Sequence, residues 1–305
     1  MKSPHIPVLK EEILDTFSKI KDGIIVDCTL GYAGHSKALL EANLSIKIVG
    51  VDKDKEAIEF SSKFLEPFKD RVEIIHAPFS KALEKIDSSK IRGLLADIGV
   101  SSLQLDKNSR GFSLNSLELD MRMDKNSALT AFKVVNNYSQ SELERVFLNY
   151  GEIKSYKNIA KKIVLAREEK EISSAVELAN IIGKRSERKG GISTATLAFQ
   201  AIRIEVNDEL KELETLLDEI ERLKLKDCTI AIISFHSLED KIVKQRFKKW
   251  QSSCICPPFL IKCECGNDHS FGKILTKKPI VATNEELSKN SRASSAKLRI
   301  FKTKG

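Results

Sequence analysis

The chain has 305 residues, of which 41% are hydrophobic and 6% aromatic, and it carries a formal net charge of +8. This length suits one large domain with an insertion or two domains, and the composition is that of an ordinary globular protein. No apolar run approaches the roughly 18 residues of a membrane helix, and the N-terminus lacks an apolar signal core. We therefore expect a cytoplasmic protein with no membrane partner.

Short apolar runs alternate with helical patterns over the first part of the chain. The expected strands are residues 23–28, 46–52, 71–76 and 91–99, and the expected helices between them are residues 36–44 and 54–64. Asp54 is the expected N-cap of the second helix. This alternation predicts βαβ units and a mostly parallel sheet, in which the carboxyl ends of the strands share the edge where ligands bind.

Helical patterns replace the strands between about residues 103 and 225. Ser141 with Glu144, and Ser174 with Glu177, have the spacing of capping boxes that begin helices. From Thr194 to Lys224 apolar residues recur at helical spacing, with an expected break near Asn207.

The strand pattern then returns in the last third of the chain. Residues 228–236 and 296–302 are expected strands, and Ser237 is the expected N-cap of the helix between them. The pattern therefore predicts a sheet that is interrupted by an inserted all-helical domain and then resumed. We expect a first sheet part at 1–104, the helical insertion at 105–216 and a second sheet part with a basic tail at 217–305.

A glycine-rich turn follows the first expected strand and carries the clearest chemical signal. It contains Gly31 and Gly34, which let the backbone approach a ligand closely, and it leads into a helix N-terminus. Asp52 ends the next strand, where a carboxylate accepts hydrogen bonds from ribose hydroxyls. The turn begins with Asp27 rather than glycine, so it suits a sulfonium-bearing zwitterion such as S-adenosylmethionine better than a pyrophosphate. A tight turn that only packs the helix on the sheet is the alternative.

Three further side chains are expected at the same edge. Asp97 ends the fourth strand and is the first candidate catalytic residue, as a hydrogen-bond acceptor for the reacting group. The alternative is that it only caps a helix. His236 follows the fifth strand and is the second candidate, since a neutral imidazole can accept or relay a proton; a structural, hydrogen-bonded histidine is equally compatible. Phe79 could stack on an adenine or belong to the core.

Basic residues are concentrated toward the C-terminus. From Lys241 onward there are 15 Lys and Arg against 4 Asp and Glu, which suggests a polyanionic partner, although the charge alone fits a solubilising surface equally well. Trp250, beside Lys248 and Lys249, is a candidate part of that surface. A second candidate phosphate-contacting segment in the insertion contains Lys184, Arg185, Arg188 and Lys189.

The six cysteines divide into two groups. Cys28 and Cys228 lie in strand-like runs and are expected core residues. The remaining four cysteines form two Cys-x-Cys pairs, Cys254, Cys256, Cys263 and Cys265. In a chain of this kind such a cluster is a candidate structural zinc site, with His269 as a spare ligand. Because Cys-x-Cys is a less common ligand spacing than Cys-x-x-Cys, the sequence alone commits us to no metal.

The sequence resembles a known family, the bacterial 16S ribosomal RNA cytosine-N4 methyltransferases, which are also called the ribosomal RNA small subunit methyltransferase H family. The matching blocks run from end to end and include GYAGHS, HAPFS, DIGVSSLQLD, RGFS, LDMRMD, TLAFQAIRIEVN, SFHSLED and SRASSAKLR. DIGVSSLQLD and SFHSLED are highly specific, whereas the glycine turn is generic.

The resemblance implies a Rossmann-like class I methyltransferase fold with a helical insertion. It implies contacts to S-adenosylmethionine from Ala33, Gly34, His35, Asp52, Phe79, Asp97 and Gln104. Ala33 stands where the family pattern usually has a second glycine, and a backbone contact survives that change. The implied substrate is a cytidine in the decoding region of 16S rRNA within the small ribosomal subunit, and no metal is implied.

Other classes of function fit the sequence less well. A nicotinamide-dependent oxidoreductase predicts a G-x-G-x-x-G turn, which is absent. A non-catalytic rRNA-binding assembly factor with a nucleotide-binding fold predicts RNA binding without uptake of S-adenosylmethionine. A methyltransferase acting on protein or a small molecule fits the spacing but not the charge of the tail.

Overall fold

The computed structural model describes residues 6–101, 104–105, 107–183, 185–187, 191–257, 259–260 and 262–305. The chain forms two compact units, one made of Met1–Gly99 with Lys211–Gly305 and the other of Val100–Leu210. The two ends of the chain thus belong to the same unit, and the segment between them forms the second. Over the described residues, no helix has both the length and the apolar character needed to cross a membrane.

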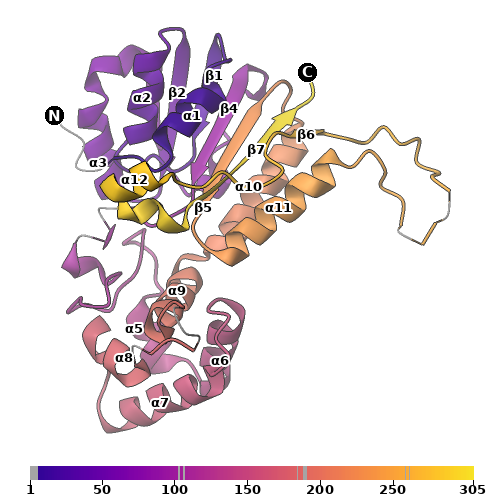
Figure 1. The fold of residues 1–305 in the computed structure, drawn as a ribbon. Coiled ribbons are helices and arrows are strands. Elements are labelled where there is room, and N and C mark those ends of the chain that lie inside the picture. Colours follow the sequence, from indigo (N-terminus) through magenta and orange to yellow (C-terminus); the bar gives the residue numbers. More distant parts are fainter. Residues whose placement is uncertain are drawn as a thin grey trace. The chain divides into compact units, whose positions relative to one another are not determined.

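The first unit is built on a seven-stranded sheet in the order β3-β2-β1-β4-β5-β7-β6 (Figure 1). The strands are β1 Gly23–Asp27, β2 Ile46–Asp52, β3 Val72–His76, β4 Ile91–Asp97, β5 Thr229–Ser234, β6 Gly272–Ile274 and β7 Lys297–Thr303. β1 to β5 are parallel, and β7 runs antiparallel to both β5 and β6. The order reverses between β1 and β4, which is where ligands bind in such sheets. This confirms the predicted Rossmann-like α/β fold with a mostly parallel sheet.

Helices cover both faces of this sheet because successive strand residues point to opposite sides. In β1, Ile25 packs in one core cluster and Val26 in the other, and in β5 the same division separates Ala231 from Ile230. One cluster includes residues of α1, α2 and α3, and the other includes residues of α10 and α11. The helices are α1 Lys10–Phe17, α2 Gly34–Ala42, α3 Lys55–Phe64, α10 Glu209–Leu223, α11 Ser237–Gln251 and α12 Asn284–Lys289.

The second unit is helical throughout its described elements. Its helices are α5 Ala131–Asn137, α6 Gln140–Asn149, α7 Tyr156–Glu169, α8 Ala175–Ile182 and α9 Thr194–Asn207. Their apolar faces form one cluster that includes Val134, Phe147, Leu178 and Phe199. The expected break in the long helical pattern is confirmed, because Asp208 adopts a left-handed conformation with φ of 51° between α9 and α10.

The helix caps correct two predictions and confirm two others, one of which is Asp54 as the N-cap of α3. The predicted box of Ser141 and Glu144 is wrong, because α6 begins two residues earlier with a capping box of Ser139 and Glu142. The predicted cap Ser237 is also wrong, since it is the first residue of α11. The box of Ser174 and Glu177 is present as predicted and begins α8.

Candidate active site at the edge of the parallel sheet

Strand register brings Asp52 and Asp97 to the same level of the sheet, two residues beyond Asp27. Asp27 at the end of β1 pairs with Gly50 of β2 and with Leu95 of β4. Asp52 and Asp97 each lie two residues beyond those partners, on either side of the loop that leaves β1. The register therefore places both carboxylates at the switch-point edge, flanking the glycine-rich turn.

Asp27 holds this turn rather than facing a ligand. It is only 2% exposed, and its Oδ2 accepts a hydrogen bond from the Ser36 hydroxyl at 2.6 Å. Burial raises the pKa of Asp27, while the bonds from Ser36 and Thr29 act in the opposite direction. Thr29 also accepts a bond from the backbone N–H of Asp97 at 2.7 Å, which joins the loop after β1 to the end of β4. The roles of Ser36 and Thr29 were not predicted from the sequence.

The turn itself needs two unusual backbone positions. Gly31 has φ of 50° and its N–H donates to Asp52 Oδ2 at 2.8 Å. Ala33 has φ of 56°, in the left-handed region, and is fully buried. A conformation of this kind costs an L-residue about 1–2 kcal/mol, a cost that glycine would avoid.

Segments from both ends of the chain support the turn. A Cβ on Gly34 would lie 2.6 Å from Cγ of Pro7, so the first residue of α2 must be glycine for the N-terminal segment to pack there. That segment is tied to the C-terminal region, because the Leu9 N–H donates to Glu286 Oε1 at 2.7 Å and Asn290 donates to the Ile6 carbonyl oxygen at 3.1 Å.

Asp52 is a partly buried acceptor that still has capacity for a ligand. Its Oδ1 accepts from the N–H of Asp54 and its Oδ2 from that of Gly31, each at 2.8 Å. Burial raises the pKa of Asp52 to about 6, against the opposing effect of these two bonds. A carboxylate has about four lone-pair positions, so two remain for ribose hydroxyls.

His35 and Asp97 contain buried polar atoms that have no hydrogen-bond partner among the described residues. His35 is buried in the first turn of α2, and there neither of its ring nitrogens is hydrogen-bonded; the same holds for Oδ1 of Asp97. Nε2 of His35 and Oδ2 of Asp97 are 3.7 Å apart, beyond hydrogen-bond distance. Each unsatisfied buried group costs about 1–3 kcal/mol, so these atoms lower the stability of the fold, and a polar ligand bound there would satisfy them.

The other expected cofactor contacts are distributed unequally. Phe79, in a short turn after β3, is 9% exposed and packs in the core cluster with Val26 and Val51, so little of its ring remains accessible. Gln104 belongs to the second unit, where it is buried and its Oε1 accepts from the Ser101 N–H at 3.0 Å. The first unit thus brings together five of the seven expected residues at the sheet edge: Ala33, Gly34, His35, Asp52 and Asp97.

His236 is the N-cap of α11. Its Nδ1 accepts from the N–H of Glu239 at 3.4 Å, and Oε2 of Glu239 accepts from the N–H groups of Phe235 and His236. Its Nε2 lies 3.0 Å from Oε1 of Glu239, although the two atoms are not aligned as a hydrogen bond. This histidine therefore has the structural environment that the sequence analysis kept as its alternative.

The expected RNA-facing surface near Trp250 is not confirmed. Trp250 is 2% exposed and packs against Phe247, Phe271 and Phe301, while its Nε1 donates to Glu221 at 3.1 Å. Its place on the inner face of α11 makes it a core residue. In the second candidate segment, Lys184, Arg188 and Lys189 lie outside the described residues.

The two isolated cysteines are buried core residues, as predicted. Burial raises the pKa of Cys28 well above its ordinary value and that of Cys228 to about 12. Neither thiol is therefore a nucleophile near neutral pH.

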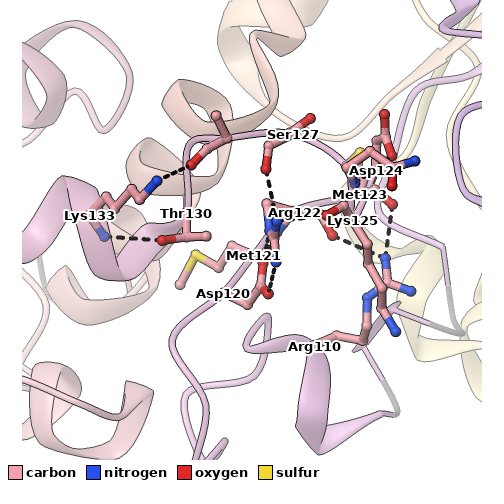
Figure 2. A network of polar contacts seen from close by, with 12 residues as sticks. Arg110, Asp120, Met121, Arg122, Met123, Asp124, Lys125, Ser127, Thr130 and Lys133 are labelled. Atoms are coloured by element: carbon pink, nitrogen blue, oxygen red, sulfur yellow. Dashed lines mark hydrogen bonds and ion pairs between the residues drawn. The ribbon is translucent and has the colours of Figure 1, made fainter.

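A loop in the second unit uses its charged side chains to support its own backbone (Figure 2). Arg110 is 1% exposed, and its Nη2 donates to the carbonyl oxygens of Arg122 and Met123, both at 3.0 Å. Arg122 in turn donates to both carboxylate oxygens of Asp120, at 2.7 and 2.8 Å. Burial acts to raise the pKa of Asp120, but these bonds lower it overall.

The same loop is anchored to α9 by Asn207. Its Oδ1 accepts from the Met123 N–H and its Nδ2 donates to the Met121 carbonyl oxygen, each at 2.8 Å. Met121 is buried with φ of 60°, so these bonds fix a backbone conformation that an L-residue rarely adopts. The blocks RGFS, LDMRMD and IRIEVN are thus joined in one structural network.

Comparison with known proteins identifies the family. The family model described as the MraW methylase family matches residues 2–304. A Campylobacter concisus protein named Ribosomal RNA small subunit methyltransferase H is 58% identical over the whole of both chains, as is one of the same name from Campylobacter hominis. A protein of that name from Aliarcobacter butzleri is 55% identical, with 99% of each chain covered. The chain belongs to the MraW methylase family.

Proposed function

We propose that this protein is an S-adenosylmethionine-dependent methyltransferase that modifies the exocyclic N4 amine of a cytidine in the decoding region of 16S rRNA. The relatives' name supports ribosomal RNA of the small subunit as the substrate. The observation that carries the enzymatic part is a set of buried side-chain atoms beside the glycine-rich turn, both ring nitrogens of His35 and Oδ1 of Asp97, which have no hydrogen-bond partner among the described residues. An architectural turn would have no reason to leave them unpaired.

The residues at this edge fit S-adenosylmethionine, which supplies an electrophilic methyl group when bound. We assign the ribose hydroxyls to Asp52, whose two carboxylate oxygens each retain a free lone pair. We assign backbone contacts to Ala33 and Gly34, because the turn is held open there by two left-handed residues. His35 and Asp97 supply polar atoms that burial has separated from water, and Phe79 and Gln104 remain proposed contacts.

Asp97 is our first candidate for activating the target amine. The lone pair of a cytosine amine is conjugated with the ring, so an acceptor for its protons localises that lone pair toward the methyl group. Oδ1 of Asp97 is a buried acceptor with no partner in the described part of the chain. Nε2 of His236 is unpaired there too, but the ring is fixed at the cap of α11 through Nδ1 and lies 3.0 Å from Glu239. His236 therefore stays the second candidate. Correct positioning of the amine can contribute as much as about 7–11 kcal/mol to lowering the barrier.

The target base has to leave any stack before it can reach a pocket of this kind. We propose that the helical insertion and the basic C-terminal region contact the rRNA around it, while the sheet edge carries out the transfer. Contacts of lysine and arginine with phosphates release counterions, so binding to the ribosomal subunit should weaken strongly with added salt. An affinity unchanged between low and moderate salt would argue against such a surface.

Nucleoside mass spectrometry of small-subunit rRNA tests the proposal. Cells lacking this gene should lose one N4-methylated cytidine, and the wild-type gene should restore it. An unchanged methylation pattern in the deletion strain would refute the assigned substrate. Calorimetry separates the non-catalytic alternative, because an assembly factor would bind ribosomal subunits while the purified, folded protein takes up no S-adenosylmethionine.

A further inference from the structure

Four cysteines lie in the long segment that joins α11 to β6, far along the chain from the sheet-edge site (Figure 1). Cys254 and Cys256 are on the outgoing arm of this segment, and Cys263 and Cys265 are on the returning arm. The arms are held together at their base, where the N–H of His269 donates to the Ser253 carbonyl oxygen at 2.9 Å. The two cysteine pairs consequently face each other across a hairpin-like loop.

The four sulfur atoms converge at one point. Sγ of Cys263 is 3.6 Å from Sγ of both Cys254 and Cys265, and the sulfur atoms of Cys254 and Cys265 are 3.8 Å apart. With Cys256 included, all four sulfurs lie within 4.8 Å of one another. Tetrahedral zinc with Zn–S distances of about 2.3 Å requires neighbouring sulfurs about 3.8 Å apart. The observed separations therefore match the edges of a tetrahedral site made of four thiolates.

Backbone groups around the cluster are arranged as they are around bound thiolates. The N–H of Ile255 points to Sγ of Cys265, and the N–H of Glu264 points to Sγ of Cys256, each at 3.4 Å. Such N–H donors orient metal-bound sulfur and offset its negative charge. Nε2 of His269 is 2.7 Å from the Cys265 carbonyl oxygen, so this ring contacts a ligand's backbone and is not needed as a fifth ligand.

Burial does not account for the convergence. Cys263 is exposed and the other three thiols are only partly buried. The apolar side chains within the loop point outward, since Ile255 is 64% exposed and Phe259 is 81% exposed. A loop with this exposure gains little from the hydrophobic effect, so another interaction has to hold its two arms in register.

We propose that Cys254, Cys256, Cys263 and Cys265 bind one zinc ion, which fixes the conformation of the loop between α11 and β6. Four thiolates leave no open coordination position, so the role of the ion is structural. The site takes no part in methyl transfer and stands independently of the substrate proposed above.

Metal analysis of the full-length protein, purified under reducing conditions, is the first test. We expect one zinc per chain in the wild type and loss of that zinc in Cys256→Ser and Cys263→Ser. His269→Ala is the matched control and should keep its zinc, because its ring contacts the backbone of Cys265 rather than a sulfur atom. Cys28→Ser, which removes a cysteine outside the cluster, should also keep it. Reduced, folded wild-type protein without zinc would overturn the proposal, as would iron in its place.

A second measurement distinguishes a metal site from a pair of disulfides. Cobalt substituted for zinc should give the strong visible absorption of a tetrahedral thiolate complex, and Cys263→Ser should abolish it. Chelation of the metal should expose the loop to trypsin at Lys262 while thermal unfolding of the sheet and uptake of S-adenosylmethionine stay unchanged. Four thiols found oxidised in protein purified under reducing conditions, with no metal bound, would refute the site.

Discussion

The sheet edge of the first unit and the arginine loop of the second unit both consist of charged sequence blocks, yet they satisfy those charges differently. At the sheet edge, ring nitrogens of His35 and a carboxylate oxygen of Asp97 are buried without partners among the described residues. In the arginine loop, Arg110 and Arg122 donate to backbone carbonyl oxygens and to Asp120. The first arrangement leaves polar atoms unpaired at a cost in stability, and we propose that a ligand satisfies them; the second uses charge to fix a backbone. Motif blocks of similar composition can therefore serve binding or architecture.

The largest expected effect sharpens the binding side of this comparison. Asp97→Ala should abolish methyl transfer, a loss of at least about a thousandfold or about 4 kcal/mol, because the amine then lacks its acceptor. Single-turnover transfer to small ribosomal subunits measures it, and thermal unfolding should show an intact fold. Near-normal turnover of the folded variant would remove Asp97 from the mechanism. If calorimetry shows that uptake of S-adenosylmethionine is lost as well, the role of Asp97 is a cofactor contact.

The next effect tests the architectural side. Arg110→Met should destabilise the second unit by about 2–3 kcal/mol, because it leaves the carbonyl oxygens of Arg122 and Met123 without their donor. Urea unfolding measures the loss. Arg222→Met is the control, since that arginine lies on the exposed face of α10 and should give no measurable change. A stable Arg110→Met protein that had lost only rRNA binding would show that Arg110 serves RNA recognition rather than the loop.

A smaller effect depends on the pKa of Asp52, which burial raises to about 6. As the pH falls through that value the carboxyl takes up a proton and accepts fewer bonds, so affinity for S-adenosylmethionine should fall by up to about tenfold per pH unit. Without ligand, the folded protein binds the Asp52 proton more tightly than the unfolded chain does. The free energy of unfolding should therefore rise as the pH falls from about 6 toward the unfolded pKa of Asp52. Calorimetry against pH measures the first effect and chemical unfolding the second.

Asp52→Asn is the control for this pH dependence. The variant should bind S-adenosylmethionine more weakly at high pH, and its affinity should vary less between about pH 5 and 7, where Asp52 would titrate. A wild-type slope that persists in Asp52→Asn would assign the titration to a different group.

The smallest expected effect concerns Ala33. Ala33→Gly relieves a left-handed alanine, which favours the folded state by about 1 kcal/mol, but it removes a buried methyl group and adds freedom to the unfolded chain, which together cost a similar amount. The stability measured in urea should therefore change by less than about 1 kcal/mol. A destabilisation beyond about 2 kcal/mol would mean that the methyl group, rather than the backbone, holds the turn.

The strands were the most predictable part of the fold. The strand expected at 46–52 is β2 without change, because a buried run bounded by polar residues admits one interpretation. β6 has only three residues and is defined by its pairing with β7, so no local sequence pattern predicts it. α1 was missed although Ile13 and Phe17 have helical spacing. The two candidate caps before α6 have identical spacing, and only packing selects Ser139 over Ser141.

The part of the candidate site that lies at the ends of strands was predictable from the sequence. Asp52 and Asp97 follow buried runs, so their place at one edge follows from parallel pairing. Ser36 was not predictable, because its role depends on a 2.6 Å contact with Asp27 that only the folded turn creates. Trp250 was misjudged because neighbouring lysines suggest a surface, whereas the helix turns the indole toward β7. The family resemblance itself is confirmed.

The bonds between the N-terminal segment and the last part of the chain bear on how the protein matures during synthesis. Pro7 packs against Gly34, and the segment that contains Pro7 is hydrogen-bonded to Glu286 and Asn290. A ribosome must therefore translate past Asn290 before the turn acquires all of its supports. We expect chains that end before Asn290 to lack an ordered glycine-rich turn. A prematurely terminated product would therefore not bind the cofactor.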